Sequence, residues 1–267
     1  MSWWGKLFGG AFGFMLGGPL GALIGAALGH SFDKGLNALP QDEAGFAPGD
    51  QERVQTAFFT ATFSVMGHVA KADGQVSEDE IALARSVMAQ MDLGLELQQA
   101  AMRLFGEGKR AGFPLDEVLD QFRQECRRRQ TLIQMFLEVQ LQAAYADGHL
   151  DPAEQRLLLH ICDRLGFPRQ IFRRLEDMVS AHYRYTGSRR GATQPTGPSI
   201  ADAYALLGLD AKASDTEVKR SYRRLLSQHH PDKLVSKGLP QEMMKMAADK
   251  THEIRQAYER IRKQRGF

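Results

Sequence analysis

The sequence is poor in cysteine: Cys126 and Cys162 are the only two thiols among 267 residues. They form no CxxC pair, so the chain has neither a disulfide framework nor the ligand spacing of a thiolate zinc site. Its formal net charge is only +2, too small for a protein built as a whole to bind nucleic acid. It also contains no phosphate-binding loop, metalloprotease motif or nucleophile–base signature. These absences favour a reducing, cytoplasmic compartment and predict neither an intrinsic enzyme activity nor a cofactor.

Charge is missing entirely from residues 7–29, a run bracketed by Lys6 and His30. A helix of this length, rising about 1.5 Å per residue, can cross a hydrocarbon core of roughly 30 Å. The run therefore predicts one transmembrane helix at 7–29, preceded by a short extracytoplasmic N-terminus at 1–6. A cleaved signal peptide fits less well, because its apolar region is shorter and residues 26–29 match a cleavage site only loosely.

Glycines recur at every fourth position of this run, at Gly9, Gly13, Gly17, Gly21, Gly25 and Gly29. In a membrane helix such a row lies along one side and allows the backbone of a second helix to approach closely. The pattern predicts a homodimer formed through the transmembrane helix. A flexible glycine linker is the alternative, but the leucine, phenylalanine and isoleucine residues between the glycines argue against a solvated chain.

The middle of the chain has the apolar spacing of helices. Residues 30–51 are rich in glycine, proline and acidic residues and predict a linker. From 52 to 185, apolar residues recur at intervals of three and four, as in Leu132, Met135, Phe136 and Val139. Almost nothing alternates with the period of a strand, so we expect an all-α domain. Residues 186–199 combine glycine, serine, threonine, proline and arginine, and predict a second, flexible linker.

An internal repeat lies within the helical region, where ADGQVSEDE at 72–80 aligns with ADGHLDPAE at 146–154. In both copies Asp-Gly suits a turn, and a Ser or Asp three residues before Glu suits a helix cap. This pattern resembles the TerB-like domain of tellurite-resistance proteins. The alternative is a site for a hard cation, with candidate ligands at Asp73, Glu80, Asp147 and Glu154. We favour caps over a metal site, because neither copy has the Asp-x-Asp-x-Asp-Gly order of a calcium loop.

The C-terminal segment, 200–267, predicts a hairpin of two helices preceded by a short one. The short helix spans 200–207 and ends at Gly208; the next begins at Ser214, which forms a capping box with Glu217. That helix spans about 215–228, and a longer one spans about 241–263. One side of the first hairpin helix carries four cations, Lys219, Arg220, Arg223 and Arg224. His230, Pro231, Asp232 and Lys233 lie in the connection between the two helices.

These elements resemble a J-domain. The matching residues are Asp202, Tyr204 and Leu207–Leu209, the basic run ending at Leu225, the His-Pro-Asp-Lys motif and Gln256–Tyr258. His-Pro-Asp alone would be weak, but its place between correctly spaced helices is specific. Combined with the glycine-rich anchor and the TerB-like middle, the whole chain resembles the DjlA family of bacterial inner-membrane co-chaperones.

The resemblance implies a regulator of Hsp70 (DnaK) rather than an enzyme. It implies that the chain stimulates Hsp70 ATP hydrolysis and suggests a link to the stress response of the envelope or to capsule synthesis. The residues that it assigns to Hsp70 binding are His230, Pro231, Asp232, Lys219, Arg220, Arg223, Arg224 and Lys233. The alternative is a metal-responsive or scaffolding membrane protein that acts through its middle domain. Nucleic-acid binding is disfavoured, because no aromatic stacking platform accompanies the cations.

The expected location is the bacterial inner membrane, with the bilayer and Hsp70 as partners. Hsp70 and ATP are cytoplasmic, so the J-domain must be cytoplasmic to meet them. The residues before Leu7 carry little charge beyond Lys6, and moving them across the membrane is easier than moving two charged domains. We therefore expect a single span with the N-terminus in the periplasm and the C-terminal domains in the cytoplasm.

Overall fold

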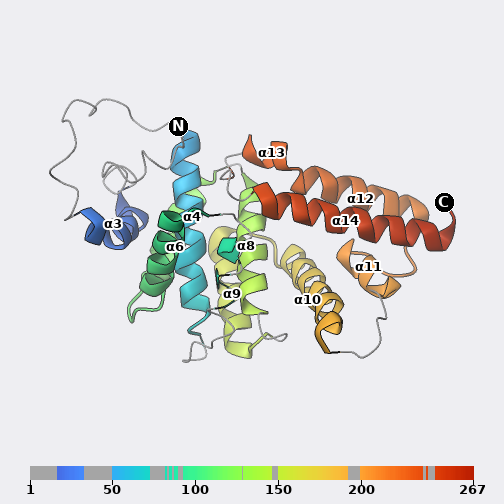
Figure 1. Cartoon of the computed structure of the whole chain (residues 1–267), viewed down its shortest axis with the longest axis horizontal. Helices are drawn as coiled ribbons and strands as arrows, with labels where there is room; N and C mark the ends of the chain where they lie inside the picture. The colour runs from blue at the N-terminus through green and yellow to red at the C-terminus, as the bar shows by residue number, and fades with distance from the viewer. Residues whose placement is uncertain are drawn as a thin grey trace.

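The computed structural model describes residues 17–32, 50–72, 93–127, 129–145, 150–191, 199–236 and 244–267, together with residues 82, 84, 85, 87–89 and 239. Every regular element in these ranges is a helix, which confirms the all-α prediction. The helices form a central bundle with α3 (Gly18–Phe32) at one end and a long hairpin at the other (Figure 1). The central helices are α4 (Asp50–Val69), α6 (Leu95–Gly108), α7 (Leu115–Glu125), α8 (Gln130–Ala144), α9 (Pro152–Leu165) and α10 (Arg169–Gly191).

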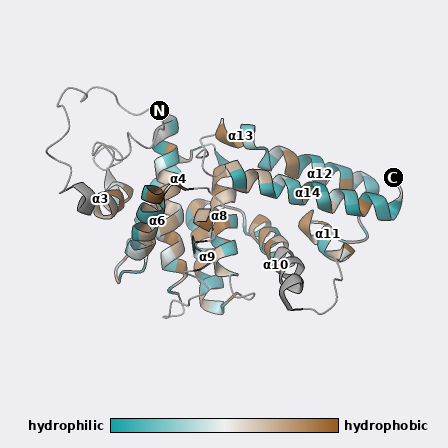
Figure 2. Cartoon of the chain, in the orientation of Figure 1, coloured by the Kyte–Doolittle hydropathy of each residue, from teal (hydrophilic) through white to brown (hydrophobic). Residues whose placement is uncertain are grey.

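The bundle is organised around α4. Residues 54–67 of this helix are buried on every side, as expected for a helix surrounded by other helices. Phe58 meets Phe122 of α7 edge-on at 6.0 Å between ring centroids, and Phe122 packs on Phe136 of α8 at 4.8 Å. Figure 2 shows the contrast between these apolar helices and the largely hydrophilic hairpin at the other end of the molecule.

Two glycines let α4 and α6 touch backbone to backbone. A Cβ on Gly67 would overlap the carbonyl oxygen of Phe105, and a Cβ on Gly108 would overlap that of Ser64. Both obstacles are main-chain atoms of a packed helix, which cannot rotate aside as a side chain can. The crossing therefore depends on the missing side chain at each position.

The second copy of the sequence repeat forms the predicted helix start. The Asp151 carboxylate accepts a hydrogen bond from the Ala153 amide, the Glu154 carboxylate accepts one from the Asp151 amide, and Pro152 occupies the first turn of α9. This arrangement is the capping box expected from the sequence. The corresponding Ser77 and Glu80 of the first copy lie outside the described residues.

The N-terminal helix of the structure covers part of the predicted span. In the described residues α3 begins at Gly18, and Gly17 and Gly18 both adopt positive φ, at 55° and 60°. Residues 7–16 of the predicted span lie outside the described residues. It packs on α4, α6 and α7, and it buries Leu20 and Ala27 there. None of the helices in the described ranges is both long and apolar enough to cross a membrane.

The expected linkers are shorter than predicted where the structure describes them. The helix α10 continues to Gly191, six residues into the segment 186–199. At the other boundary α3 extends to Phe32 and α4 begins at Asp50, so both ends of the segment 30–51 are helical. The residues at these boundaries are helical because each group continues a helix whose other residues pack against the bundle.

Candidate functional site

The C-terminal hairpin consists of α12 (Asp215–His229) and α14 (Met244–Arg265), with the short α11 (Ile200–Leu206) packed across it. Its core is apolar, and the buried apolar residues that the two long helices contribute to it are Val218, Leu225, Ile254, Ala257 and Ile261. The rings of Tyr222 and Tyr258 stack at 4.0 Å with an interplanar angle of 11°. These residues hold the two helices in register, as the sequence pattern predicts.

Local capping places the start of α12. The Ser214 hydroxyl accepts a hydrogen bond from the Glu217 amide, and the Glu217 carboxylate accepts one from the Ser214 amide at 2.7 Å. The bonds from Ser214 lower the pKa of Glu217, because they stabilise its ionised form. Gly208 follows α11 at φ 66°, in the left-handed conformation of a helix C-cap.

The His-Pro-Asp motif begins a helix of its own, α13 (Pro231–Val235), where the sequence pattern indicated a loop. His230 has extended backbone angles and occupies the N-cap position, and Pro231 follows at the start of the helix. Proline suits this place because it has no amide hydrogen to leave unpaired, and Asp232 in the first turn complements the helix dipole. Pro231 and Asp232 therefore belong to a regular helix rather than to an irregular loop.

The polar side chains of the motif face outward. The Asp232 side chain is 85% exposed and its carboxylate lies 3.9 Å from the His230 ring, which is 47% exposed. The Lys233 ammonium bends back to donate a hydrogen bond to the Ser227 hydroxyl of α12 at 2.7 Å. An acidic group and an imidazole are thus both available to a partner at this end of the hairpin.

The four cations of the predicted basic face of α12 differ in the contacts that they make. All four are exposed, and Arg220 and Arg223 lie at the centre of the face. At one edge the Lys219 ammonium lies 4.7 Å from the centroid of the Phe267 ring. At the other, Arg224 donates a hydrogen bond to Ser221, and burial, with neighbouring Arg174, lowers its pKa. The central pair is therefore best placed to meet an acidic surface.

The same end of the hairpin is packed into the central bundle. Leu234 and Leu239 are fully buried and belong to the core cluster of the bundle rather than to that of the hairpin. The Gln55 amide of α4 donates a hydrogen bond to the Leu239 carbonyl at 3.3 Å. This contact was not predicted, because the leucines of the connection do not show which surface covers them.

His229, the residue before the motif, is the ionisable group at this junction. It is 2% exposed, and its Nε2 atom lies 3.7 Å from the Glu138 carboxylate of α8. The Thr251 hydroxyl of α14 donates a hydrogen bond to the His229 carbonyl at 3.1 Å. Burial lowers the pKa of His229, and the opposing influence of Glu138 is smaller. His229 was not predicted as a site residue, because the sequence shows it only as the first of two adjacent histidines, His229 and His230.

We expect this histidine to make the stability of the protein depend on pH. Unfolding returns His229 to its ordinary pKa of 6.5, above its value in the folded chain. Below that pH the unfolded chain binds a proton that the folded chain does not, so the free energy of unfolding falls as the solution is acidified. Urea denaturation at pH 7.5 and 5.5 should show a smaller fall for His229→Gln than for the wild type. Equal falls would remove His229 from this account.

Most of the other predicted site residues lie outside the described residues. Of the four candidate cation ligands, Asp73, Glu80 and Asp147 lie outside the described residues, while Glu154 caps α9. No cluster of three or more His, Cys, Asp or Glu side chains suited to a metal occurs in the ranges that the structure describes.

The glycine row is only partly covered. Gly9 and Gly13 lie outside the described residues, and Gly17 precedes the helix. Gly21 is buried and Gly25 is exposed, and Gly29 lies within α3.

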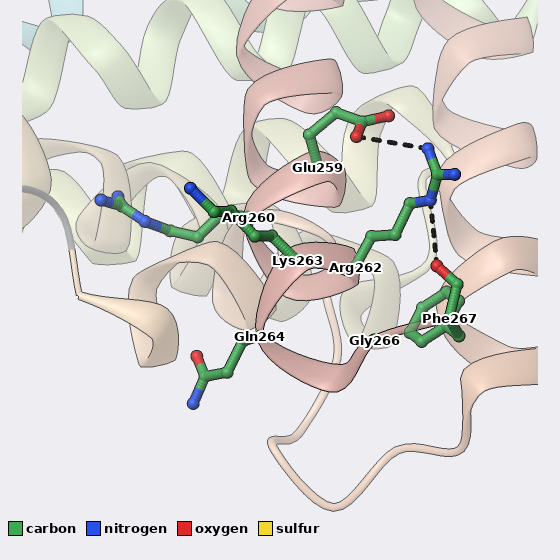
Figure 3. A pocket seen from close by; sticks show the side chains of 7 residues that line it. All are labelled: Glu259, Arg260, Arg262, Lys263, Gln264, Gly266 and Phe267. Atoms are coloured by element: carbon green, nitrogen blue, oxygen red, sulfur yellow. Dashed lines mark hydrogen bonds and ion pairs between the residues drawn. The ribbon is translucent and has the colours of Figure 1, made fainter.

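A hollow at the far end of α14 is lined by polar and charged side chains of this helix and by the last two residues of the chain. Figure 3 shows Arg262 between the Glu259 carboxylate and the terminal Phe267, to whose carbonyl oxygen it donates a hydrogen bond at 2.9 Å. The remaining lining residues shown are Arg260, Lys263, Gln264 and Gly266. We assign this surface no catalytic role.

Comparison with known proteins divides the chain into three parts. Residues 1–39 match the family described as the transmembrane domain of co-chaperone DjlA, residues 59–177 match tellurite resistance protein TerB, and residues 202–265 match the DnaJ domain. No solved structure matches the chain.

Several curated relatives are similar over the entire length. A protein of Coxiella burnetii named co-chaperone protein DjlA is 47% identical over 100% of both chains. Proteins of the same name from Photobacterium profundum and Shewanella oneidensis are each 46% identical, over 99% and 100% of both chains respectively.

Proposed function

Because the chain belongs to the DjlA family of co-chaperones and ends in a J-domain, we propose that it binds Hsp70 (DnaK) and stimulates its ATP hydrolysis at the inner membrane. The observation that carries this proposal is the outward-facing Asp232, held at the start of α13. A carboxylate in that position can form charge-assisted hydrogen bonds with an arginine of Hsp70. Single-turnover ATP hydrolysis by Hsp70 should accelerate when the full chain is added, and an unchanged rate would contradict the proposal.

In this mechanism the two surfaces of the J-domain have different tasks. Arg220 and Arg223 attract an acidic surface of Hsp70, which speeds and orients the encounter. His230, Pro231 and Asp232 then bind the ATP-bound conformation better than the others and shift the population of Hsp70 toward the hydrolysing state. The reaction itself takes place within Hsp70, so the chain needs no nucleophile or metal of its own.

We also propose the domain limits and contacts that the sequence predicts. These are a membrane anchor near residues 7–29, a TerB-like domain at 52–185 and a J-domain at 200–267, with dimerisation through the glycine row. The match of residues 1–39 to a transmembrane domain supports the anchor. A role for the middle domain in envelope-stress or capsule signalling belongs to the same proposal.

The proposed orientation predicts which introduced thiols an impermeant reagent can reach. In intact spheroplasts a cysteine at Ser2 should be labelled, whereas one at the exposed Gln264 should be labelled only after lysis. The native thiols give little background, because Cys126 and Cys162 are buried and burial raises the pKa of each to about 12. Labelling of the Gln264→Cys variant in intact spheroplasts would place the J-domain on the wrong side of the membrane.

A further inference from the structure

The helix α3 lies in a seat that binds the backbone of its first turn. The Gln121 side chain of α7 accepts a hydrogen bond from the Leu20 amide at 2.9 Å and donates one to the Gly17 carbonyl at 3.0 Å. The Leu20 amide lies in the first turn of α3, where amides lack a partner within the helix. Both hydrogen bonds involve backbone atoms of α3, so Gln121 binds the start of the helix without a hydrogen bond to any of its side chains.

A second polar contact binds the backbone further along the helix. The Arg103 guanidinium of α6 donates a hydrogen bond to the Ala27 carbonyl at 2.8 Å. Between these two contacts, Leu20, Leu23, Ile24 and Ala27 are buried in the main core cluster. The seat thus combines an apolar floor with a polar group near each end of the helix that it holds.

Small residues occupy the part of α3 that approaches Gln121. Gly21 is buried against the bundle, and a Cβ on Gly18 would come within 2.9 Å of the Gln121 side chain. The helix suited to this seat is uncharged and has small residues where it meets Gln121. This mode of recognition is that of an apolar helix lying in a groove.

The seat and the membrane compete for the same segment. Residues 1–39 match a transmembrane domain, and α3 lies within them. A helix within the bilayer cannot also fill a groove on α6 and α7. Whenever α3 is in the membrane, the apolar floor of its seat is therefore open, and an open apolar surface of this kind is typical of a binding site.

We propose that this seat, formed by α4, α6 and α7, is a client-binding groove. When α3 is inserted in the bilayer, the groove takes an uncharged helix rich in small residues from another polypeptide. Gln121 and Arg103 bind the backbone of that helix, so many sequences of this class fit. The groove would hold such a segment on the same chain that presents its J-domain to Hsp70.

The test uses the full chain inserted in nanodiscs of phosphatidylethanolamine and phosphatidylglycerol. The probe is a fluorescent peptide with the sequence of residues 17–32 and a trilysine tail for solubility, and empty nanodiscs give the lipid background. Fluorescence anisotropy should detect binding above that background. The double variant Gln121→Ala/Arg103→Ala should bind at least tenfold more weakly, on the order expected from losing three hydrogen bonds, one of them charged.

The matched control is Gln124→Ala/Arg127→Ala, which removes the same two side-chain types from exposed positions at the end of α7. It should bind the peptide as the wild type does. Equal binding by the Gln121→Ala/Arg103→Ala variant, or no binding above empty nanodiscs because α3 keeps its seat, would overturn the proposal. Stimulation of Hsp70 without peptide should be the same in all these proteins, so this result is separable from failure of the J-domain itself.

Discussion

Replacement of Asp232 by asparagine is expected to abolish the stimulation of Hsp70 ATP hydrolysis. Hydrogen bonds to a charged group contribute about 1.5–3 kcal/mol, so their loss corresponds to roughly a ten- to hundredfold weaker productive contact. The Asp232 side chain is 85% exposed and is not part of either core cluster, so the fold should be unaffected. The measurement is the single-turnover rate of Hsp70 with the full-length variant, compared with the wild type.

A matched change of charge separates the motif from the general electrostatics of the hairpin. Asp249→Asn removes the same charge from an exposed position on α14 and should keep the wild-type stimulation. Circular dichroism should give the same helicity for all three proteins. Full stimulation by Asp232→Asn would contradict the proposed function, and a loss of helicity would show that Asp232 acts on the fold instead.

The largest expected loss of stability follows from a single methyl group at the crossing of α4 and α6. In Gly108→Ala the new Cβ would overlap the Ser64 carbonyl, and the helices must separate to accommodate it. Overpacking of this kind costs typically 1–3 kcal/mol, and the upper end or beyond is expected here because the obstacle is backbone. Urea denaturation should show the change as a lower midpoint.

The same helix provides the control for this prediction. Gly106 lies two residues earlier, and a Cβ there would meet no atom within 4 Å. Since alanine forms helix better than glycine by about 1 kcal/mol, Gly106→Ala should leave stability unchanged or raise it. Comparable losses in Gly106→Ala and Gly108→Ala would mean that the close crossing is not what limits stability.

Features that depend on neighbouring residues could be predicted from the sequence. The capping boxes at Ser214 and Asp151 form as expected, and α12 begins at the predicted residue and ends one residue later than predicted. Such signals are local, because a cap or an amphipathic stripe acts within a few residues of its position. The helical start at Pro231 also follows a local rule, although we expected only a connection between the two long helices there.

Contacts between distant segments could not be predicted in this way. Nothing in residues 229–239 indicates that α4 and α8 are the surface on which His229 and Leu239 pack. Likewise, the apolar run near the N-terminus has the composition of a membrane span, and the groove on α6 and α7 offers α3 a second apolar environment. Periodicity shows which side of a helix is buried but not which partner covers it.

By itself, therefore, the sequence determined the all-α class, the J-domain hairpin and the place of the His-Pro-Asp motif between its two long helices, since propensity, capping and periodicity are encoded locally. Only the tertiary structure decided that this motif lies against the central bundle beside a buried histidine. The same holds for the close backbone contact at Gly108 and for the hydrogen bond between Gln121 and the first turn of α3. Each of these features depends on which surfaces pack together. Because hydrophobic burial is non-directional, an apolar segment of the sequence does not indicate which other segment will cover it.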